Sequence, residues 1–265
     1  MTRGAGDPAE PPSERTFTKR YPGAPAGFFA VEAAGLAWLR DAGPGAARVV
    51  GVRGVGDDFI VVERLTAVRP TAAAAEEFGR ALARTHAAGA GAFGQPPPGW
   101  TGDGFIGRQP LTLRPAPHWG TFYAEQRLLP YARQARKRGT LSRSGLAVVE
   151  RVADRLVAGE FDDGRPPARI HGDLWSGNVM FTTSGVVLID PAAHGGHGLA
   201  DLGMLSLFGA PHLAAMTAAY AEAAGLQRGW RDLLGLHQLQ PLLVHAVSHG
   251  GAYGVQAEHT ARRYA

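Results

Sequence analysis

The chain has 265 residues, of which 45% are hydrophobic and 19% are charged, with a formal net charge of +4 and no cysteine. This composition is ordinary for a globular protein with ample material for a core, and it excludes disulfides and thiolate metal sites. No apolar run approaches the roughly 18 residues that a membrane helix needs, and the N-terminus lacks the apolar stretch of a secretory signal. We therefore expect a cytoplasmic protein with no membrane partner.

The N-terminal part of the chain predicts a small α+β unit. Residues 1–15 are rich in Gly, Pro and charge, and we expect them to be disordered. A strand, a helix and two further strands follow, at 16–20, 28–40, 49–53 and 59–63. We assign residues 16–67 to an N-terminal lobe on the nucleotide side of the molecule.

From Pro70 onwards the pattern is mainly helical. Thr71 is expected to cap the first of these helices. Apolar residues recur at helical spacing in segments at 71–88, 119–138, 145–158, 199–208, 212–224 and 230–248. Two short strands are expected at 179–181 and 186–189. We assign residues 68–265 to a large helical lobe that carries the substrate cleft, because ligands often bind where two lobes meet.

Basic residues are dispersed along the chain, and the densest group is Arg133, Arg136, Lys137 and Arg138. No aromatic residues are interleaved with this group, as a nucleic-acid surface would require. We therefore expect no nucleic-acid partner and interpret the group as the solvated end of a helix. The modest positive charge also suits an anionic ligand such as ATP.

Residues 171–178, His-Gly-Asp-Leu-Trp-Ser-Gly-Asn, carry the strongest chemical signal. Phosphoryl transfer to a hydroxyl needs a carboxylate that orients the hydroxyl and accepts its proton, and oxygen ligands for Mg²⁺ beside the phosphates. Asp173 suits the first task and is the predicted catalytic residue. Asn178 and Asp190 suit the second as metal ligands, because the predicted hairpin returns Asp190 beside Asn178. Each residue alone would be an ordinary turn former, but the joint spacing favours a kinase site.

The same segment, followed by Ile-Asp-Pro-Ala at 189–192 and Gly-Gly-His-Gly at 195–198, resembles the fructosamine kinase (ketosamine kinase) family. That family is related to aminoglycoside phosphotransferases and protein kinases, and the Trp-Ser pair after His-Gly-Asp-Leu distinguishes it. The resemblance runs from about residue 17 to the C-terminus. It implies a protein-kinase-like two-lobed fold, with ATP and Mg²⁺ as cofactors. It also implies phosphorylation of a sugar hydroxyl on a ketosamine of the fructosamine or ribulosamine type, leading to deglycation.

The resemblance assigns the nucleotide-binding residues as well. Lys19 resembles the phosphate-contacting lysine, and Glu32 resembles the helix glutamate that pairs with it. Lys19 is also one of only two lysines in an arginine-rich chain, and a compact ammonium suits point contact with phosphate oxygens. Glu63 and Leu65 lie in a segment that resembles the hinge, whose backbone holds adenine.

Trp175 and His197 are the candidate substrate-binding residues. Trp175 would stack on the sugar or shape its pocket, and the alternative is a packed core aromatic. His197 would contact the substrate, and the alternative is an orienting or structural role. The resemblance further suggests that Asp201 anchors the catalytic loop. His245 and His249, one helical turn apart, would line the acceptor side or belong to the core or surface.

The N-terminal lobe departs from the family pattern, because only 18 residues precede Lys19, where the family has two strands and a Gly-containing phosphate lid. We expect a truncated lobe without the lid, or a natural start upstream of Met1. The alternatives to a ketosamine kinase are an aminoglycoside- or choline-type phosphotransferase and a catalytically weak nucleotide-binding protein. The few acids of the C-terminal helices weigh against a polycation site; they are Glu222, Asp232 and Glu258.

Overall fold

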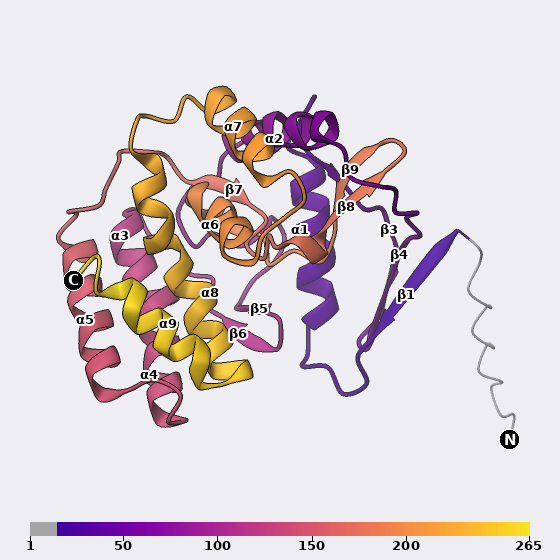
Figure 1. Cartoon of the computed structure of the whole chain (residues 1–265). Coiled ribbons are helices and arrows are strands. Elements are labelled where there is room, and N and C mark those ends of the chain that lie inside the picture. The colour runs from indigo at the N-terminus through magenta and orange to yellow at the C-terminus, as the bar shows by residue number, and fades with distance from the viewer. Residues whose placement is uncertain (1–14) are drawn as a thin grey trace, which may run out of the picture.

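The computed structural model describes residues 15–265, so the disorder expected for residues 1–14 lies outside the described part. A small sheet-containing region at the N-terminal side adjoins a larger, mainly helical region (Figure 1). This arrangement is the α+β, two-lobed architecture that the sequence predicts.

The N-terminal sheet has three antiparallel strands in the order β1-β4-β3. Its strands are β1 (Thr16–Arg20), β3 (Val52–Val55) and β4 (Phe59–Glu63). β1 pairs with β4 in a register that sets Lys19 opposite Ile60. Ile60 is fully buried, and Lys19 therefore sits on a strand whose position is fixed by the core.

The single strand expected at 49–53 is divided in the structure into β2 (Arg48–Val49) and β3. The division has a local cause: Val50 donates its N–H to Leu188, outside the sheet, while Gly51 accepts the N–H of Glu63. β2 instead runs parallel to β9 (Gly185–Leu188). It therefore ties the N-terminal region to the hairpin that follows the 171–178 segment.

Helix α1 (Phe28–Arg40) lies between the sheet and the C-terminal helices (Figure 1). Its Phe29 and Leu36 side chains are fully buried in one core cluster with Ile60 of β4 and Val187 of β9. Burial of each such side chain stabilises the fold by about 1.5–3 kcal/mol. The packing fixes α1, and with it Glu32, against both the sheet and the hairpin.

Eight α-helices lie in the region from Ala72 to Ala261 in the described part. They are α2 (Ala72–Ala87), α3 (Trp119–Phe122), α4 (Leu129–Lys137), α5 (Arg143–Val157), α6 (Leu199–Phe208), α7 (Leu213–Ala223), α8 (Leu234–His249) and α9 (Gly251–Ala261). The predicted cap of α2 is confirmed, since Thr71 Oγ1 accepts the N–H of Ala74 at 3.2 Å. The largest core cluster joins the apolar faces of α4, α5, α8 and α9. None of the helices in the described part is both long and apolar enough to cross a membrane.

Two predicted helices have different bounds in the structure. The helix expected at 119–138 is interrupted by a π-helical segment, Tyr123–Leu128, before α4 begins with Pro130 in its first turn. Proline cannot donate the backbone hydrogen bond that would continue a regular helix. The helix expected to end at 248 is followed by α9, which the sequence pattern did not reveal. Gly250, at φ 112°, separates the two.

Short strand pairs hold the segment that carries the sequence motif. β8 (Val179–Thr182) and β9 form the predicted hairpin, with Val179 opposite Leu188. β7 (Ala168–Ile170) pairs with β10 (His194–Gly196), with Ile170 opposite His194. The two ends of the stretch 171–193 therefore meet. A further hairpin is formed by β5 (Gly104–Ile106) with β6 (Gln109–Leu111).

Candidate active site

The motif segment folds into a tight loop between β7 and β8. It ends in a 3₁₀ turn, Ser176–Asn178, whose asparagine points back into the loop. The Asn178 side-chain nitrogen donates to the Asp173 carbonyl at 2.8 Å and to the Asp190 carbonyl at 3.3 Å. The structure therefore brings together Asp173, Asn178 and Asp190, as their spacing predicted.

Asp190 joins this loop to the N-terminal region through Lys19. Lys19 Nζ lies 2.9 Å from Glu32 Oε2 and 3.2 Å from Asp190 Oδ2. The Asp190 backbone is left-handed, at φ 53°, a conformation that costs most side chains but that aspartate tolerates. One ammonium thus links strand β1, the helix α1 that follows it, and the loop after β9, which is far from both in the sequence.

The electrostatics of the cluster follow from burial and from the crowding of carboxylates. Burial, with the charges of Asp190 and Asp201, raises the pKa of Asp173 to about 7. Burial alone would lower the pKa of Lys19, but attraction to Glu32 and Asp190 raises it overall. Lys19 is therefore a permanent cation at neutral pH, whereas Asp173 is poised to exchange a proton.

Asp201, at the start of α6, anchors the loop through hydrogen bonds to its backbone, as the resemblance suggested. Its carboxylate accepts the backbone N–H of His171 at 2.8 Å and that of Gly172 at 2.9 Å. His86 of α2 lies 3.0 Å from the same carboxylate and 2.7 Å from the Tyr220 hydroxyl. These buried contacts fix the backbone just before Asp173.

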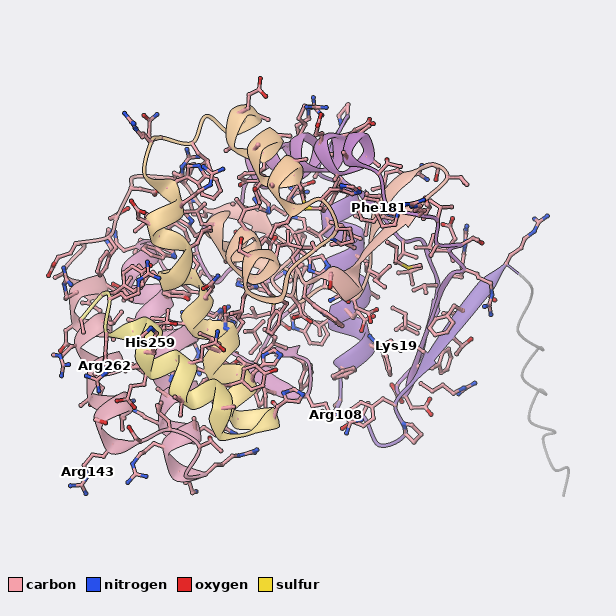
Figure 2. All side chains as sticks on the ribbon, viewed as in Figure 1. Lys19, Arg108, Arg143, Phe181, His259 and Arg262 are labelled. Atoms are coloured by element: carbon pink, nitrogen blue, oxygen red, sulfur yellow. The ribbon has the colours of Figure 1, made fainter. Side chains whose placement is uncertain are left out.

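A cavity of about 1090 Å³ opens between the two regions and includes the residues of the cluster. Lys19, Glu32, Asp173, Asn178 and Asp190 all line it. Figure 2 shows Lys19 at the edge of the N-terminal sheet, directed toward the helical region. This volume is at the upper end of ordinary ligand pockets, and it can hold a nucleotide and a small acceptor together.

Trp175 lines the same cavity, and its side chain is 43% exposed. Its indole ring lies against Gly177, where a Cβ atom would meet the ring carbons at 2.3 Å. Glycine at 177 therefore leaves the space that the indole occupies. Trp175 is thus placed at the cavity wall and not in the core.

The two predicted hinge residues, Glu63 and Leu65, do not line this cavity. Glu63 and Leu65 line a second, smaller cavity of about 200 Å³, together with Arg48, Val49 and Val187. The N–H of Glu63 is occupied by the Gly51 carbonyl at 2.8 Å. The structure therefore does not bring these side chains to Lys19, and their predicted role depends on the backbone of the chain that links the two regions.

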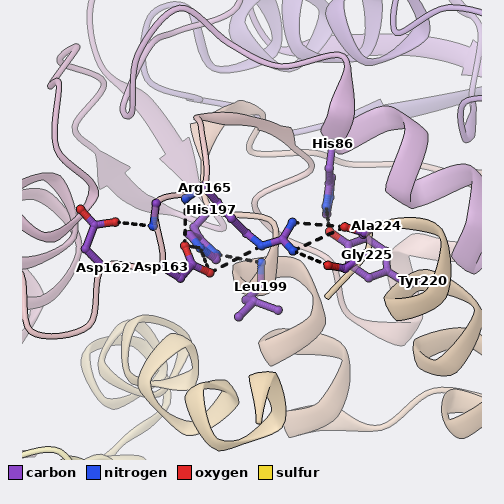
Figure 3. A network of polar contacts seen from close by, with 10 residues as sticks. His86, Asp162, Asp163, Arg165, His197, Leu199, Tyr220, Ala224 and Gly225 are labelled. Carbon is purple, nitrogen blue, oxygen red and sulfur yellow. Dashed lines mark hydrogen bonds and ion pairs between the residues drawn. The ribbon is translucent and has the colours of Figure 1, made fainter. Parts of the chain in front are cut away.

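His197 is also set apart from the cavity. Its ring is buried and lies 3.2 Å from Asp163 Oδ1, and it stacks on His237 with ring centroids 4.7 Å apart. Figure 3 shows Asp163 between His197 and Arg165, whose guanidinium reaches the carbonyls at the end of α7. This placement fits the orienting or structural alternative, because His197 does not line the cavity.

The cavity is completed by residues that the motif did not indicate. They are Arg108 and Gln109 at the β5–β6 turn, Arg138 after α4, and His245, Ser248, His249 and Tyr253 of α8 and α9. Arg108 and Gln109 lie in a hairpin, and Tyr253 in a helix, that the sequence pattern did not indicate. Of the two outcomes left open for His245 and His249, the structure places both residues at the cavity.

Comparison with known proteins identifies the family of the chain. The fructosamine kinase family matches residues 10–265 of the chain. A probable ketoamine kinase of Synechocystis is 34% identical over 205 residues, which cover 77% of this chain and 66% of that protein. The chain thus spans just under two thirds of that relative's length.

Solved structures also resemble this chain. A putative fructosamine-3-kinase from Thermobifida fusca superposes with a TM-score of 0.86 at 47% identity, covering 94% of this chain and 85% of that one. A thermostable mutant of an aminoglycoside phosphotransferase, in a ternary complex with ADP and hygromycin B, superposes with a TM-score of 0.53 at 16% identity, covering 88% and 82%. The second likeness shows the protein-kinase-like fold alone. Since the family match covers nearly the whole chain, this protein belongs to the fructosamine kinase family.

Proposed function

We propose that the protein transfers the γ-phosphoryl group of ATP to a sugar hydroxyl of a ketosamine, with fructosamines and ribulosamines as the acceptor types. The observation that carries this proposal is the meeting of Lys19, Asp173, Asn178 and Asp190 at one cavity. The phosphorylated adduct would then release the amine, so the reaction would lead to deglycation.

Lys19 marks the phosphate end of the cavity. Its ammonium is a compact cation at the cavity wall, held in place by Glu32, whose side chain is only 8% exposed. A fixed ammonium contacts phosphate oxygens as a point charge. The nucleotide of the aminoglycoside phosphotransferase, which shares the fold, is consistent with this assignment. We assign the adenine to the backbone between Glu63 and Leu65.

The residues beside Lys19 also fit Mg²⁺. No group of three or more His, Cys, Asp or Glu side chains in the described part is arranged to hold a metal. Mg²⁺ in nucleotide sites needs only one or two protein oxygens, with phosphates and water completing the shell. The Asp190 carboxylate, whose side chain is 44% exposed, and the side-chain amide oxygen of Asn178 supply these two protein oxygens. Bound there, Mg²⁺ would neutralise phosphate charge.

Asp173 performs the proton transfer in this proposal. The acceptor hydroxyl oxygen forms a bond to the γ-phosphorus, the bond from that phosphorus to the bridging oxygen breaks, and ADP leaves. The hydroxyl proton passes to the Asp173 carboxylate. A pKa of about 7 suits a group that takes up and gives away a proton near neutral pH. The positioning of ATP against the acceptor hydroxyl supplies most of the remaining rate acceleration.

The alternative acceptors are weaker matches to the cavity. An aminoglycoside is a polycation, and the carboxylates that line the cavity are those at the phosphate end, Glu32, Asp173 and Asp190. The acids of the C-terminal helices named above do not line it. A catalytically weak nucleotide-binding protein would bind ATP without turnover, which the assay below distinguishes.

The test is ATP consumption with Mg²⁺, using a fructosamine, a ribulosamine, an aminoglycoside and choline as parallel acceptors. We expect turnover on the two ketosamines only, reduced by about 100-fold or more in Asp173→Asn, which keeps the side-chain shape but removes the base. Turnover confined to the aminoglycoside or choline would replace the ketosamine assignment. Thermal stabilisation by ATP with no turnover on any acceptor would support the nucleotide-binding alternative.

A further inference from the structure

One part of the cavity wall is built by three separate elements, the β5–β6 hairpin, the end of α4 and helix α8. Gln109 of the β5–β6 hairpin donates to the Ser248 hydroxyl of α8 at 3.2 Å. Arg138, which follows α4, donates to the Val247 carbonyl of the same helix at 2.6 Å. We call Arg108, Gln109, Arg138, Ser248 and His249 the acceptor end of the cavity.

Charge is distributed unequally between the two ends. Glu32, Asp173 and Asp190 are the carboxylate-bearing residues among those that line the cavity, and all three belong to the cluster around Lys19. The acceptor end carries the guanidinium groups of Arg108 and Arg138 and no carboxylate among its lining residues. The acceptor end is therefore a cationic wall, whereas the carboxylates of the cavity belong to the cluster around Lys19.

Both arginines hold their guanidinium groups without a carboxylate partner among the described residues. Arg108 lies over the Tyr21 ring at 4.7 Å from the centroid. Arg138 uses one nitrogen for the Val247 carbonyl. Neither takes part in an ion pair of the described part. Arg138 belongs to the basic group interpreted from the sequence as a solvated helix end, so its place at the cavity is a feature of the fold.

A cluster of three rings also lines this part of the cavity. The His245 ring stacks on His249 with centroids 4.9 Å apart, and Tyr253 contacts both rings, at 5.0 Å from His245 and 6.2 Å from His249. Burial lowers the pKa of His245, which favours its neutral form. The two guanidinium groups supply the permanent positive charge of this end, while the rings offer flat surface to the rest of the acceptor.

Resting on the proposed function above, we propose that the acceptor carries a carboxylate on its amine part and that Arg108 and Arg138 bind it. The substrate class is then a sugar adduct of an amino acid with a free α-carboxylate. A planar guanidinium matches a carboxylate with two parallel hydrogen bonds. The same wall repels a polyamine or aminoglycoside, which sharpens the choice between acceptors.

The experiment compares two ketosamines that differ only in charge, fructosyl-glycine and fructosyl-glycinamide. We expect the wild-type protein to prefer the carboxylate by about tenfold in kcat/KM, the effect of one charge-assisted hydrogen bond. Arg108→Gln should lower kcat/KM for fructosyl-glycine about tenfold more than for the amide. The preference should also shrink as salt is raised.

Arg143→Gln is the matched control, because Arg143 is an exposed arginine of α5 that does not line the cavity. Figure 2 labels Arg108 and Arg143. It should leave the preference intact. Arg138→Gln is measured together with its melting temperature, since Arg138 also holds Val247, and it should likewise reduce the preference.

Two results would overturn the inference while leaving the proposed function standing. One is equal turnover of the two ketosamines by the wild-type protein. The other is an Arg108→Gln variant that loses the same factor on both acceptors with a raised KM for ATP, which would assign Arg108 to the phosphates. Absence of turnover on every ketosamine would instead contradict the proposed function itself.

Discussion

The Asp201 side chain holds the backbone of His171: its Oδ2 atom accepts the His171 N–H at 2.8 Å, while Oδ1 accepts the next N–H, that of Gly172. Asp201 is 1% exposed and His171 is fully buried. A carboxylate can accept from both donors at once, whereas an amide has only one acceptor atom. The loop that presents Asp173 therefore depends on a charge at a distant helix start.

Replacing Asp201 by Asn should destabilise the protein by about 2–4 kcal/mol, because one buried N–H then faces an amide that cannot accept from it. The free energy of unfolding in urea measures the loss, and ketosamine turnover should fall with it because Asp173 is displaced. Asp232→Asn, at an exposed aspartate, is the control and should change stability by less than about 0.5 kcal/mol. Equal stabilities for the two variants would refute the anchoring role.

The same carboxylate predicts how stability changes in acid. Burial opposes the charge of Asp201, but the hydrogen bond and charge of His86, with the contacts of His171, lower its pKa overall. A lowered folded-state pKa gives stability that is complete above the unfolded value, about 3.9, and is lost as the pH falls through the lower folded value. The stability gap between wild type and Asp201→Asn should therefore be constant from about pH 7 to pH 5 and shrink below about pH 4. Urea midpoints at these pH values test this, and a gap unchanged at pH 3 would contradict it.

Lys19 and Glu32 form an ion pair, and the contribution of each residue to stability can be measured separately. Lys19→Met leaves Glu32 buried near Asp190 without its cation and should cost about 1–3 kcal/mol. Glu32→Gln should cost less, since burial already raises the pKa of that carboxyl. In the double variant the remaining buried charge is removed, so part of the stability should return, with a coupling of about 1 kcal/mol.

Activity should not return with stability in that double variant. The proposed phosphate contact of Lys19 is lost in both Lys19 variants, so kcat/KM for ATP should stay low by about 100-fold. Unfolding curves and ATP kinetics on the same four proteins make the comparison. Additive stability effects would mean that the two side chains do not interact, and restored turnover would remove Lys19 from the phosphate site.

Gly172 is needed for two reasons, its conformation and its neighbours. Its φ is +80°, and a Cβ atom there would lie 2.3 Å from the Ala192 carbonyl oxygen. Gly172→Ala should cost more than about 2 kcal/mol, whereas Gly159→Ala, at φ +79° in open space, should cost only about 1 kcal/mol. Thermal or urea unfolding of the two variants isolates the contact from the backbone strain, and equal losses would show that the Ala192 contact is unimportant.

Local spacing was sufficient to predict the cluster at the loop. Asn178 and Asp190 are separated by one hairpin, and hairpin geometry returns the chain to its starting point whatever the rest of the fold does. Thr71 at its helix start is equally local. Lys19 and Glu32, on adjacent elements, came from resemblance supported by the scarcity of lysine. These features depend on a few neighbouring residues, and their signal survives in the sequence alone.

The tertiary structure decided everything that depends on contacts between distant elements. Gln109 meets Ser248 across 139 positions, and Arg138, which is exposed at the end of α4 as expected, also lines the cavity. His197, beside the motif in the sequence, packs instead against His237 and Asp163. Side-chain periodicity specifies which face of an element is apolar but not which element will cover it, so the acceptor end exists only once α4, α8 and the β5–β6 hairpin have packed together.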